Sequence, residues 1–252
     1  MYFVSDLHLG YDHSLHSLER EKVFINWLKA IELNCKALYL VGDTFDYWFE
    51  YRSVVPKGYV RLLSKLADWA ESGIAVHFLK GNHDMWVADY FSKELQFVVH
   101  QDLVDTTIDG KRFLILHGDG LGKGDWLYKI TKSIFRNSFC QRLFSMIHPS
   151  IGLSVMKAYS KMSRERGDHK PDVSKLSDQI EYCENQLINS HFDFFIMGHY
   201  HYAHQARLSN GTSTYINLGD WVHQFSYGVW NGSEFKLDRI NPTLNSQPES
   251  QH

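Results

Sequence analysis

Short apolar runs that stop at a polar residue recur along the chain and predict strands. The clearest of them cover residues 2–4, 37–42, 74–79, 112–116 and 194–197. Between the first three runs, residues 18–31 and 60–70 place apolar side chains three to four positions apart, which predicts two helices. This strand–helix alternation predicts an α/β fold with parallel strand pairs.

The alternation stops after His117. A glycine-rich segment at 118–124 leads into a long helical pattern that reaches Ile147, and a second helical pattern from Leu176 to Leu187 precedes the run at 194–197. Three short strands are predicted near 214–218, 227–230 and 235–237. We therefore predict a catalytic domain built from residues 1–122 and 185–240, a helical cap insertion at 123–184, and a polar, disordered tail at 241–252.

Composition places the chain among ordinary globular proteins. It has 252 residues, of which 44% are hydrophobic and 22% charged. No signal-peptide pattern and no apolar stretch of membrane-spanning length is present. We therefore expect a cytoplasmic protein. Its three cysteines are far apart in sequence, which argues against a disulfide framework.

Charge is distributed unevenly along the chain. Residues 123–170 carry ten Lys and Arg residues against three Asp and Glu residues, although the formal net charge of the whole chain is −3. Such a segment is often only a solvated face, but it also suits a diphosphate or an anionic lipid surface. We expect that this basic segment makes peripheral contact with the inner face of the cell membrane.

The residues that follow the apolar runs are the chemistry-bearing ones. Because ligand sites in open α/β sheets lie beyond the carboxyl ends of the strands, these side chains should share one crevice. Seven nitrogen and oxygen ligands exceed what one ion needs, which predicts two divalent metal ions. The donor types favour Mn²⁺, with Fe or Zn²⁺ as alternatives. Asp43 is the candidate for bridging them. The predicted ligands are Asp6, His8, Asp43, Asn82, His117, His199 and His201.

Taken singly, each of these short motifs could be no more than turn residues. Together and in order they resemble the signature of the calcineurin-type metallophosphoesterases. The matching motifs are Asp6-x-His8, Gly42-Asp43-x-x-Asp46, Gly81-Asn82-His83-Asp84, His117 and Gly198-His199-x-His201.

The resemblance implies a four-layer αββα sandwich with two mixed β-sheets and a helical cap. It also implies that Asp6, His8 and His201 hold one ion. The other ion would be held by Asn82, His117 and His199, and Asp43 would bridge the two.

A narrower resemblance links the chain to the UDP-2,3-diacylglucosamine pyrophosphatases of lipid A synthesis, over roughly residues 1–238. The chain differs from the best-known branch in carrying His83 where that branch has arginine. This resemblance implies cleavage of a UDP-linked glycolipid to UMP and 2,3-diacylglucosamine 1-phosphate. The motifs that carry it are Gly42-Asp43-x-Phe45-Asp46-x-Trp48, His117-Gly-Asp119-x-Leu121, Asp125-x-x-Tyr128 and Leu218-Gly219-x-Trp221.

Candidate roles follow for residues beside the ligands. His83 is predicted to act as a general acid or to stabilise charge on phosphate, with Asp84 orienting its ring, and Asp46 is predicted to support the ligands without binding metal. Asp125 and Tyr128 are substrate contacts on the resemblance alone. Four basic residues of the cap are candidates for binding the diphosphate: Lys161, Arg164, Arg166 and Lys170.

Three alternatives stay open at this point. A phosphoesterase of the same class could act on nucleotides, phosphodiesters or phosphoproteins. A scaffold of the same fold could bind no metal, although the complete ligand set argues against it. The basic segment would also suit nucleic acid, but we expect a phosphorylated small molecule or glycolipid as the partner; no oligomeric state is indicated.

Overall fold

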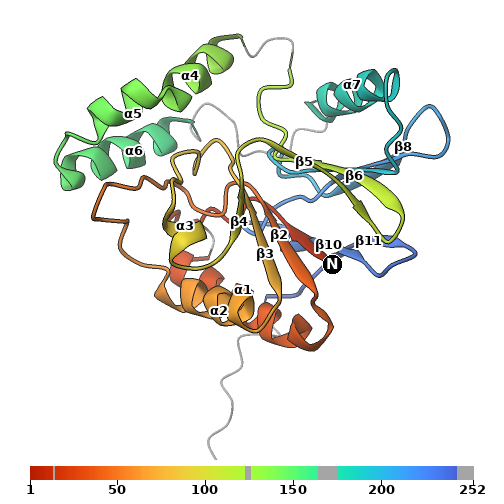
Figure 1. Ribbon diagram of the computed structural model, residues 1–252, viewed down its shortest axis with the longest axis horizontal. Helices are drawn as coiled ribbons and strands as arrows, with labels where there is room; N and C mark the ends of the chain where they lie inside the picture. Colours follow the sequence, from red (N-terminus) through yellow and green to blue (C-terminus); the bar gives the residue numbers. More distant parts are fainter. Residues whose placement is uncertain (14, 123–125, 164–174, 243–252) are drawn as a thin grey trace, which may run out of the picture.

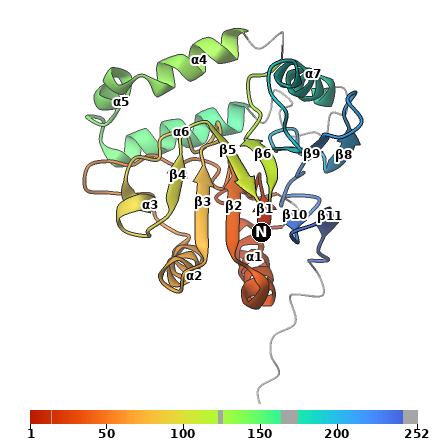
Figure 2. The same cartoon turned by 45° about the vertical axis from the view of Figure 1, so that its right-hand side comes forward.

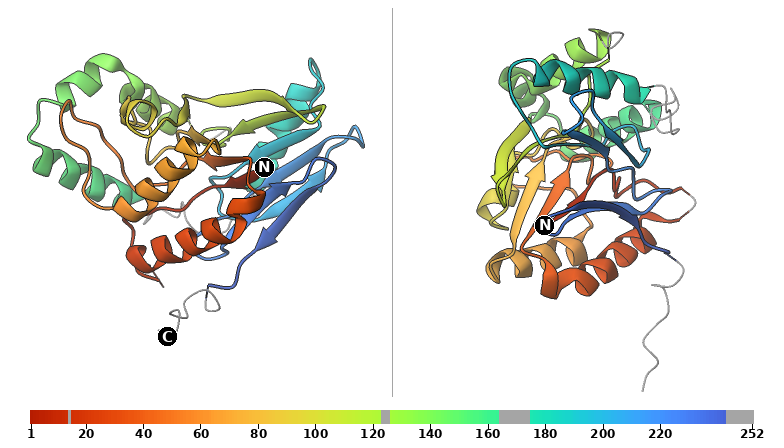
Figure 3. Two further views of the ribbon diagram at one scale, coloured as in Figure 1. Left: turned by 60° about the horizontal axis from the view of Figure 1, so that its bottom comes forward. Right: turned by 90° about the vertical axis from the view of Figure 1, so that its right-hand side faces the viewer.

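Two β-sheets lie face to face and carry helices on both outer faces (Figure 1). This is seen in a computed structural model that describes residues 1–13, 15–122, 126–163 and 175–242. Figure 3 shows the two sheets packed against each other, with the helices α1 (Ser17–Ile31) and α2 (Val60–Glu71) on one outer side and α7 (Leu176–Leu187) on the other. The predicted αββα sandwich with two mixed sheets is confirmed.

The first sheet has six strands in the order β11-β10-β1-β2-β3-β4. Strands β1 to β4 are parallel, whereas β10 pairs antiparallel with both β1 and β11. Its strands are β1 (Tyr2–Val4), β2 (Ala37–Val41), β3 (Ala75–Leu79), β4 (Val98–His100), β10 (Ser226–Trp230) and β11 (Phe235–Arg239).

The second sheet has five strands in the order β5-β6-β7-β9-β8. Strands β6, β7 and β9 are parallel, and β5 and β8 flank them in antiparallel orientation. Its strands are β5 (Leu103–Ile108), β6 (Lys111–Leu116), β7 (Phe194–Met197), β8 (His204–Arg207) and β9 (Thr214–Asn217).

Strand β2 shows why the apolar runs are continuous. Successive side chains of a strand point to opposite faces. Leu38 and Leu40 pack with α1 and α2, while Tyr39 and Val41 face the second sheet. Both faces are therefore buried, which removes the polar alternation of a half-exposed strand.

Three helices lie across the edge of the first sheet where β2 and β3 end, as Figure 2 shows. They are α4 (Trp126–Arg136), α5 (Ser138–Phe144) and α6 (Pro149–Ser163). An aromatic cluster joins them to the loops after β2 and β3, with Phe49 and Trp86 packed against Phe135 and Phe144. Among the described residues, no helix is long and apolar enough to cross a membrane.

The elements differ from the sequence prediction in three places. The long helical pattern after His117 is interrupted at Asn137, whose side chain accepts hydrogen bonds from the amides of Phe139 and Cys140 and so caps α5. The boundary predicted at residue 184 cuts α7, yet this helix packs on the second sheet through Cys183 and Leu176. The prediction also omitted β4, β5, β8, α3 (Tyr90–Lys93) and the 3-10 helix Glu32–Asn34.

The division into a catalytic domain and a cap otherwise stays a prediction. Most of the predicted tail, residues 243–252, lies outside the described residues.

Candidate metal centre

The seven predicted ligands converge from the ends of five strands. Asp6 and His8 follow β1, and the remaining ligands follow β2, β3, β6 and β7 of both sheets. The backbone has a positive φ at Asp6, His8, Asp43, His199 and His201. A left-handed backbone at a non-glycine residue costs about 1–3 kcal/mol and is concentrated at functional sites. Five such residues in one place indicate a site that the fold holds against strain.

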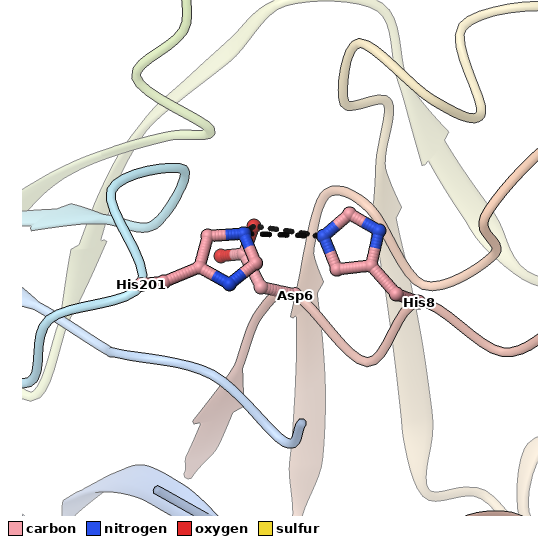
Figure 4. A group of neighbouring side chains, drawn as sticks. All are labelled: Asp6, His8 and His201. Carbon is pink, nitrogen blue, oxygen red and sulfur yellow. Dashed lines mark hydrogen bonds and ion pairs between the residues drawn. The ribbon is translucent and has the colours of Figure 1, made fainter. Parts of the chain in front are cut away.

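Asp6, His8 and His201 form the first group of ligands (Figure 4). The two Nε2 atoms lie 3.2 Å apart, and Asp6 Oδ1 lies 3.6 Å from His8 Nε2 and 3.3 Å from His201 Nε2. All three side chains are buried. Two imidazole nitrogens and a carboxylate oxygen therefore face one point, as ligands of a metal ion would.

Asp43, His117 and His199 form the second group. His117 Nε2 lies 3.2 Å from Asp43 Oδ2 and 3.2 Å from the amide oxygen of Asn82. Asp43 Oδ2 is also 3.8 Å from His8 Nε2, so this one oxygen faces both groups. The structure brings all seven predicted ligands together, with Asp43 in the shared position.

Two glycines let the loops come close to the carboxylates. A Cβ added at Gly81 would lie 2.1 Å from Asp43 Oδ1, and one added at Gly198 would lie 2.5 Å from Asp6 Oδ2. Neither distance is compatible with a side chain. These contacts give a physical reason for glycine directly before Asn82 and directly before His199.

Electrostatics fit a cation at this point. Burial alone would lower the pKa of His117 and of His201, but the carboxylates of Asp43 and Asp6 outweigh it and raise each pKa to about 10. His199 behaves differently, because burial and then the charge of His117 lower its pKa to about 4. Burial would raise the pKa of Asp43, but the charges of His117, His83 and His8 hold it below its usual range.

The donor set also fits a divalent metal ion. Asp6 Oδ1 is buried and forms no hydrogen bond with any described residue, although the imidazoles of His8 and His201 lie near it. A buried carboxylate oxygen in this situation is suited to a cation. Mixed imidazole, carboxylate and amide donors match first-row divalent metals better than Ca²⁺.

Metal uptake should release protons. A metal takes neutral imidazole, so ions entering at about pH 8 must displace the protons held by His117 and His201. Metal affinity should therefore rise with pH up to about 10. Calorimetric titration with Mn²⁺ in buffers of different ionisation enthalpy measures the released protons, and an uptake heat that is independent of buffer would contradict the prediction.

The same pKa values predict that the folding stability of the metal-free chain falls as the pH rises. Both histidines have folded pKa values above the unfolded value of 6.5. The stability that their protonated forms contribute is therefore complete below pH 6.5 and is lost as the pH rises through about 10.

Asp84 does not orient the ring of His83, and this part of the prediction is wrong. Its carboxylate accepts hydrogen bonds from the amides of Gly81 (2.7 Å), Thr44 (2.8 Å) and Phe45 (3.3 Å). The side chain therefore ties the loop after β3 to the loop after β2. Burial and then repulsion from Asp43 raise the pKa of Asp84 to about 7.

The ring of His83 is held by other groups. Its Nδ1 lies 2.9 Å from the carbonyl oxygen of Asp46 and 3.2 Å from Ser160 Oγ on α6. Asp46 also places its carboxylate 3.8 Å from His8 Nδ1, which agrees with a supporting position beside the ligands. Ser160 was not predicted, because a single serine in the cap segment gives no sign of what it contacts.

Asp220 is a second residue that the sequence analysis missed. Its Oδ2 lies 3.1 Å from His201 Nδ1, and its Oδ1 accepts hydrogen bonds from the amides of His223 (2.7 Å) and Gln224 (2.8 Å). A carboxylate on Nδ1 directs the Nε2 lone pair of His201 toward a metal ion. Its position inside Leu218-Gly219-x-Trp221 was the available signal.

Asp220→Asn should weaken metal binding at the first group by about 10–100-fold, because the amide no longer fixes the ring of His201 as a carboxylate does. Competitive metal titration against a chelating dye measures this. Asp68→Asn, an exposed change on α2, is the matched control. Equal metal affinity in both variants would contradict the assigned position of Asp220.

The predicted substrate contacts are only partly described. Asp125, Arg164, Arg166 and Lys170 lie outside the described residues. Tyr128 belongs to α4, and Lys161 is exposed near the end of α6. Their role in substrate binding stays a prediction.

An apolar cavity of about 130 Å³ opens beneath the three helices, next to the ligands. Asn82 and His83 form its end near the metal centre. Its other walls come from the loop after β3 and from α4 to α6, mainly Met85, Trp86, Phe135, Phe144, Met156 and Tyr159. An apolar group attached to a phosphate at the metal centre would therefore find a matching surface.

Comparison with known proteins finds a matching family and several relatives. The family model described as calcineurin-like phosphoesterase matches residues 1–203. The UDP-2,3-diacylglucosamine hydrolase of Porphyromonas gingivalis is 34% identical and covers 95% of this chain and 97% of its own. That of Photorhabdus laumondii is 29% identical over 98% of each chain. The solved structure of an archaeal phosphodiesterase aligns with 95% of this chain and 100% of its own, at 13% identity and a TM-score of 0.45.

Proposed function

The chain belongs to the calcineurin-like phosphoesterase family, and we propose that within this family it cleaves the pyrophosphate bond of a UDP-linked diacylglucosamine. Water would add to the α-phosphorus and the bond to the bridging oxygen would break, releasing UMP and 2,3-diacylglucosamine 1-phosphate. The chain is thus a metal-dependent hydrolase, and the proposal concerns its substrate. The observation that carries it is the apolar cavity that begins at Asn82 and His83.

The metal centre supports the reaction type. Asp6, His8 and His201 would hold one divalent ion, and Asn82, His117 and His199 the other. Two ions held by these residues would polarise the phosphate oxygens and stabilise the charge that develops in a displacement at phosphorus.

The residues of the chain itself orient the substrate and supply a proton. Asp43 would fix the position of the two ligand groups relative to each other, because its Oδ2 faces both. The Asp46 carbonyl engages Nδ1 of His83, so Nε2 is the atom that would donate to a phosphate oxygen. Ser160 holds the same ring from α6, and this contact connects the helices above the site to the reacting groups.

We propose Mn²⁺ as the native metal and peripheral contact with the inner face of the cell membrane as the setting. Mixed oxygen and nitrogen donors support the first. Exposed apolar side chains on α5 and α6 support the second, including Phe139 (67% exposed), Leu143 (52%) and Ile151 (58%). Turnover after reconstitution with Mn²⁺, Fe²⁺ or Zn²⁺ tests the metal, and co-sedimentation with anionic vesicles tests the contact.

The substrate is tested by hydrolysis across a panel in the presence of Mn²⁺. The panel contains UDP-2,3-diacylglucosamine, its deacylated analogue, a nucleotide phosphodiester and a phosphopeptide. We expect the diacylated compound to be cleaved with the highest kcat/KM, because only it fills the apolar cavity. Equal or faster cleavage of the deacylated analogue would refute the lipid substrate, and preference for the diester or phosphopeptide would support the alternative phosphoesterase activities.

A further inference from the structure

A second crevice, of about 560 Å³, lies on the other side of Met85 and Trp86 from the apolar cavity. Both residues line both spaces, so they form the wall between them. The crevice is bounded by the loops after β2, β3 and β4 and by the facing ends of α4 and α5. Four of its lining residues are basic, namely Arg52, Lys80, Arg136 and Arg142.

Lys80 is the residue that makes this crevice unusual. It is only 8% exposed, and its backbone amide is engaged by the carbonyl of His100. Its ammonium group forms no hydrogen bond or ion pair with any residue in the described parts of the chain. An ammonium group that has lost most of its hydration and has no direct hydrogen-bond or ion-pair partner is suited to a bound anion.

The two acidic residues in the crevice are already engaged. Glu50 accepts hydrogen bonds from the indole of Trp48 (3.1 Å) and from the amides of Asp89 (2.8 Å) and Tyr90 (3.0 Å). Asp102 forms an ion pair with Arg136. Among the described residues, neither carboxylate forms an ion pair with Lys80, because Glu50 is bound to the indole and amides and Asp102 to Arg136.

Two arginines add to this positive charge. Arg52 follows β2 and Arg142 lies on α5, and within the described ranges neither guanidinium has an ion-pair partner. Arginine presents a planar fork that matches the oxygens of phosphate, and lysine supplies a point charge. Three cations around one enclosed space thus suit a dianion with several acceptor oxygens.

We propose that this crevice binds a phosphate monoester dianion, with Lys80 at its base and Arg52 and Arg142 at its sides. Phe49, Trp86 and Val87 also line the space and would contact the organic group that carries the phosphate. The site is separate from the metal centre and does not depend on the proposed substrate. Because its residues come from both the strand-end loops and α5, the bound anion would tie these helices to the sandwich.

The test uses calorimetric titration of inorganic phosphate into protein that is loaded with Mn²⁺ and kept in buffer free of sulfate. The wild-type chain should bind phosphate at two kinds of site, the metal centre and the crevice. Lys80→Met should lose the crevice component, with affinity reduced by at least about tenfold, and Arg142→Gln should weaken it. Lys29→Met, an exposed change on α1, should leave both components intact.

Thermal melting in phosphate-free buffer provides an independent readout. Because methionine removes an unpaired buried charge, Lys80→Met should melt at least about 2 °C above the wild type. A lower melting temperature for Lys80→Met would mean that its ammonium group stabilises the fold through the protein alone, which contradicts an anion site. Phosphate isotherms that are identical in wild type, Lys80→Met and Arg142→Gln would likewise overturn the proposal. If Lys80→Met does not fold, the phosphate isotherm of Arg142→Gln is the test.

The source of the phosphate monoester is resolved by two further probes. Glycerol 3-phosphate represents a free metabolite, and phosphatidylcholine vesicles with or without phosphatidic acid represent a lipid headgroup. Binding of either that is lost in Lys80→Met supports the site and identifies its source. Binding of both with wild-type strength by Lys80→Met would place the anions elsewhere and overturn it.

Discussion

Asp43→Asn should reduce turnover by at least about 10³-fold and lower the bound metal below two ions per chain. Oδ1 of Asp43 accepts a hydrogen bond from the His83 amide (2.8 Å), so the amide nitrogen of asparagine would take the place of Oδ2. That atom lies 3.2 Å from His117 Nε2 and 3.8 Å from His8 Nε2, where both ions would share it. The loss of several kcal/mol of charge stabilisation corresponds to this fall in rate.

Release of UMP and elemental analysis of the purified variant measure the two effects. Asp105→Asn makes the same chemical change in an exposed pair with Arg112 and should keep turnover within about twofold. Circular dichroism confirms that both variants are folded. An Asp43→Asn protein that keeps two ions and turns over within tenfold of wild type would remove Asp43 from the shared position.

His83→Ala should lower kcat by about 10²–10⁴-fold while metal content stays close to that of the wild type. The first effect is expected because the variant has no group to donate a proton to the phosphate oxygen. The second is expected because Nδ1 of His83 is directed to the Asp46 carbonyl, 2.9 Å away.

Metal analysis distinguishes a proton-donating role of His83 from a metal-binding role. His83 also lies close enough to His8 and Asp43 to complete a third group of candidate ligands. If His83 binds an ion, the alanine variant will lose metal together with activity. His191→Ala, an exposed change at the far end of β7, should alter neither quantity.

Much of the fold could be predicted because the runs that form β1, β2, β3, β6 and β7 are short, apolar and bounded by turns. Strand β5 was not predicted because it lies at the edge of its sheet, where the exposed Asp105 and Thr107 break the apolar pattern. Strand β4 is only three residues long, Val98–His100. Neither has enough apolar periodicity to be distinguished from a loop.

The ligands could be predicted because each follows directly on a strand. What the sequence could not show is how side chains are used away from the strand ends. Asp84 looked like a partner for the adjacent His83, but its oxygens are taken by backbone amides of the β2 loop. Backbone donors have no sequence signature, and contacts between distant segments, such as Ser160 with His83, depend on packing alone.

The pairing of β1 with β10 bears on the order in which the chain acquires its structure. Tyr2 aligns with Val229, so β1 has one side without a partner until β10, more than 200 residues later, has been made. His199 and His201 also arrive late, which leaves the carboxylates of the early loops without their imidazole neighbours during synthesis. Contacts this far apart in sequence fold slowly. We expect the nascent chain to depend on protection of that open edge until β10 has been made, and chains shortened before β10 to aggregate.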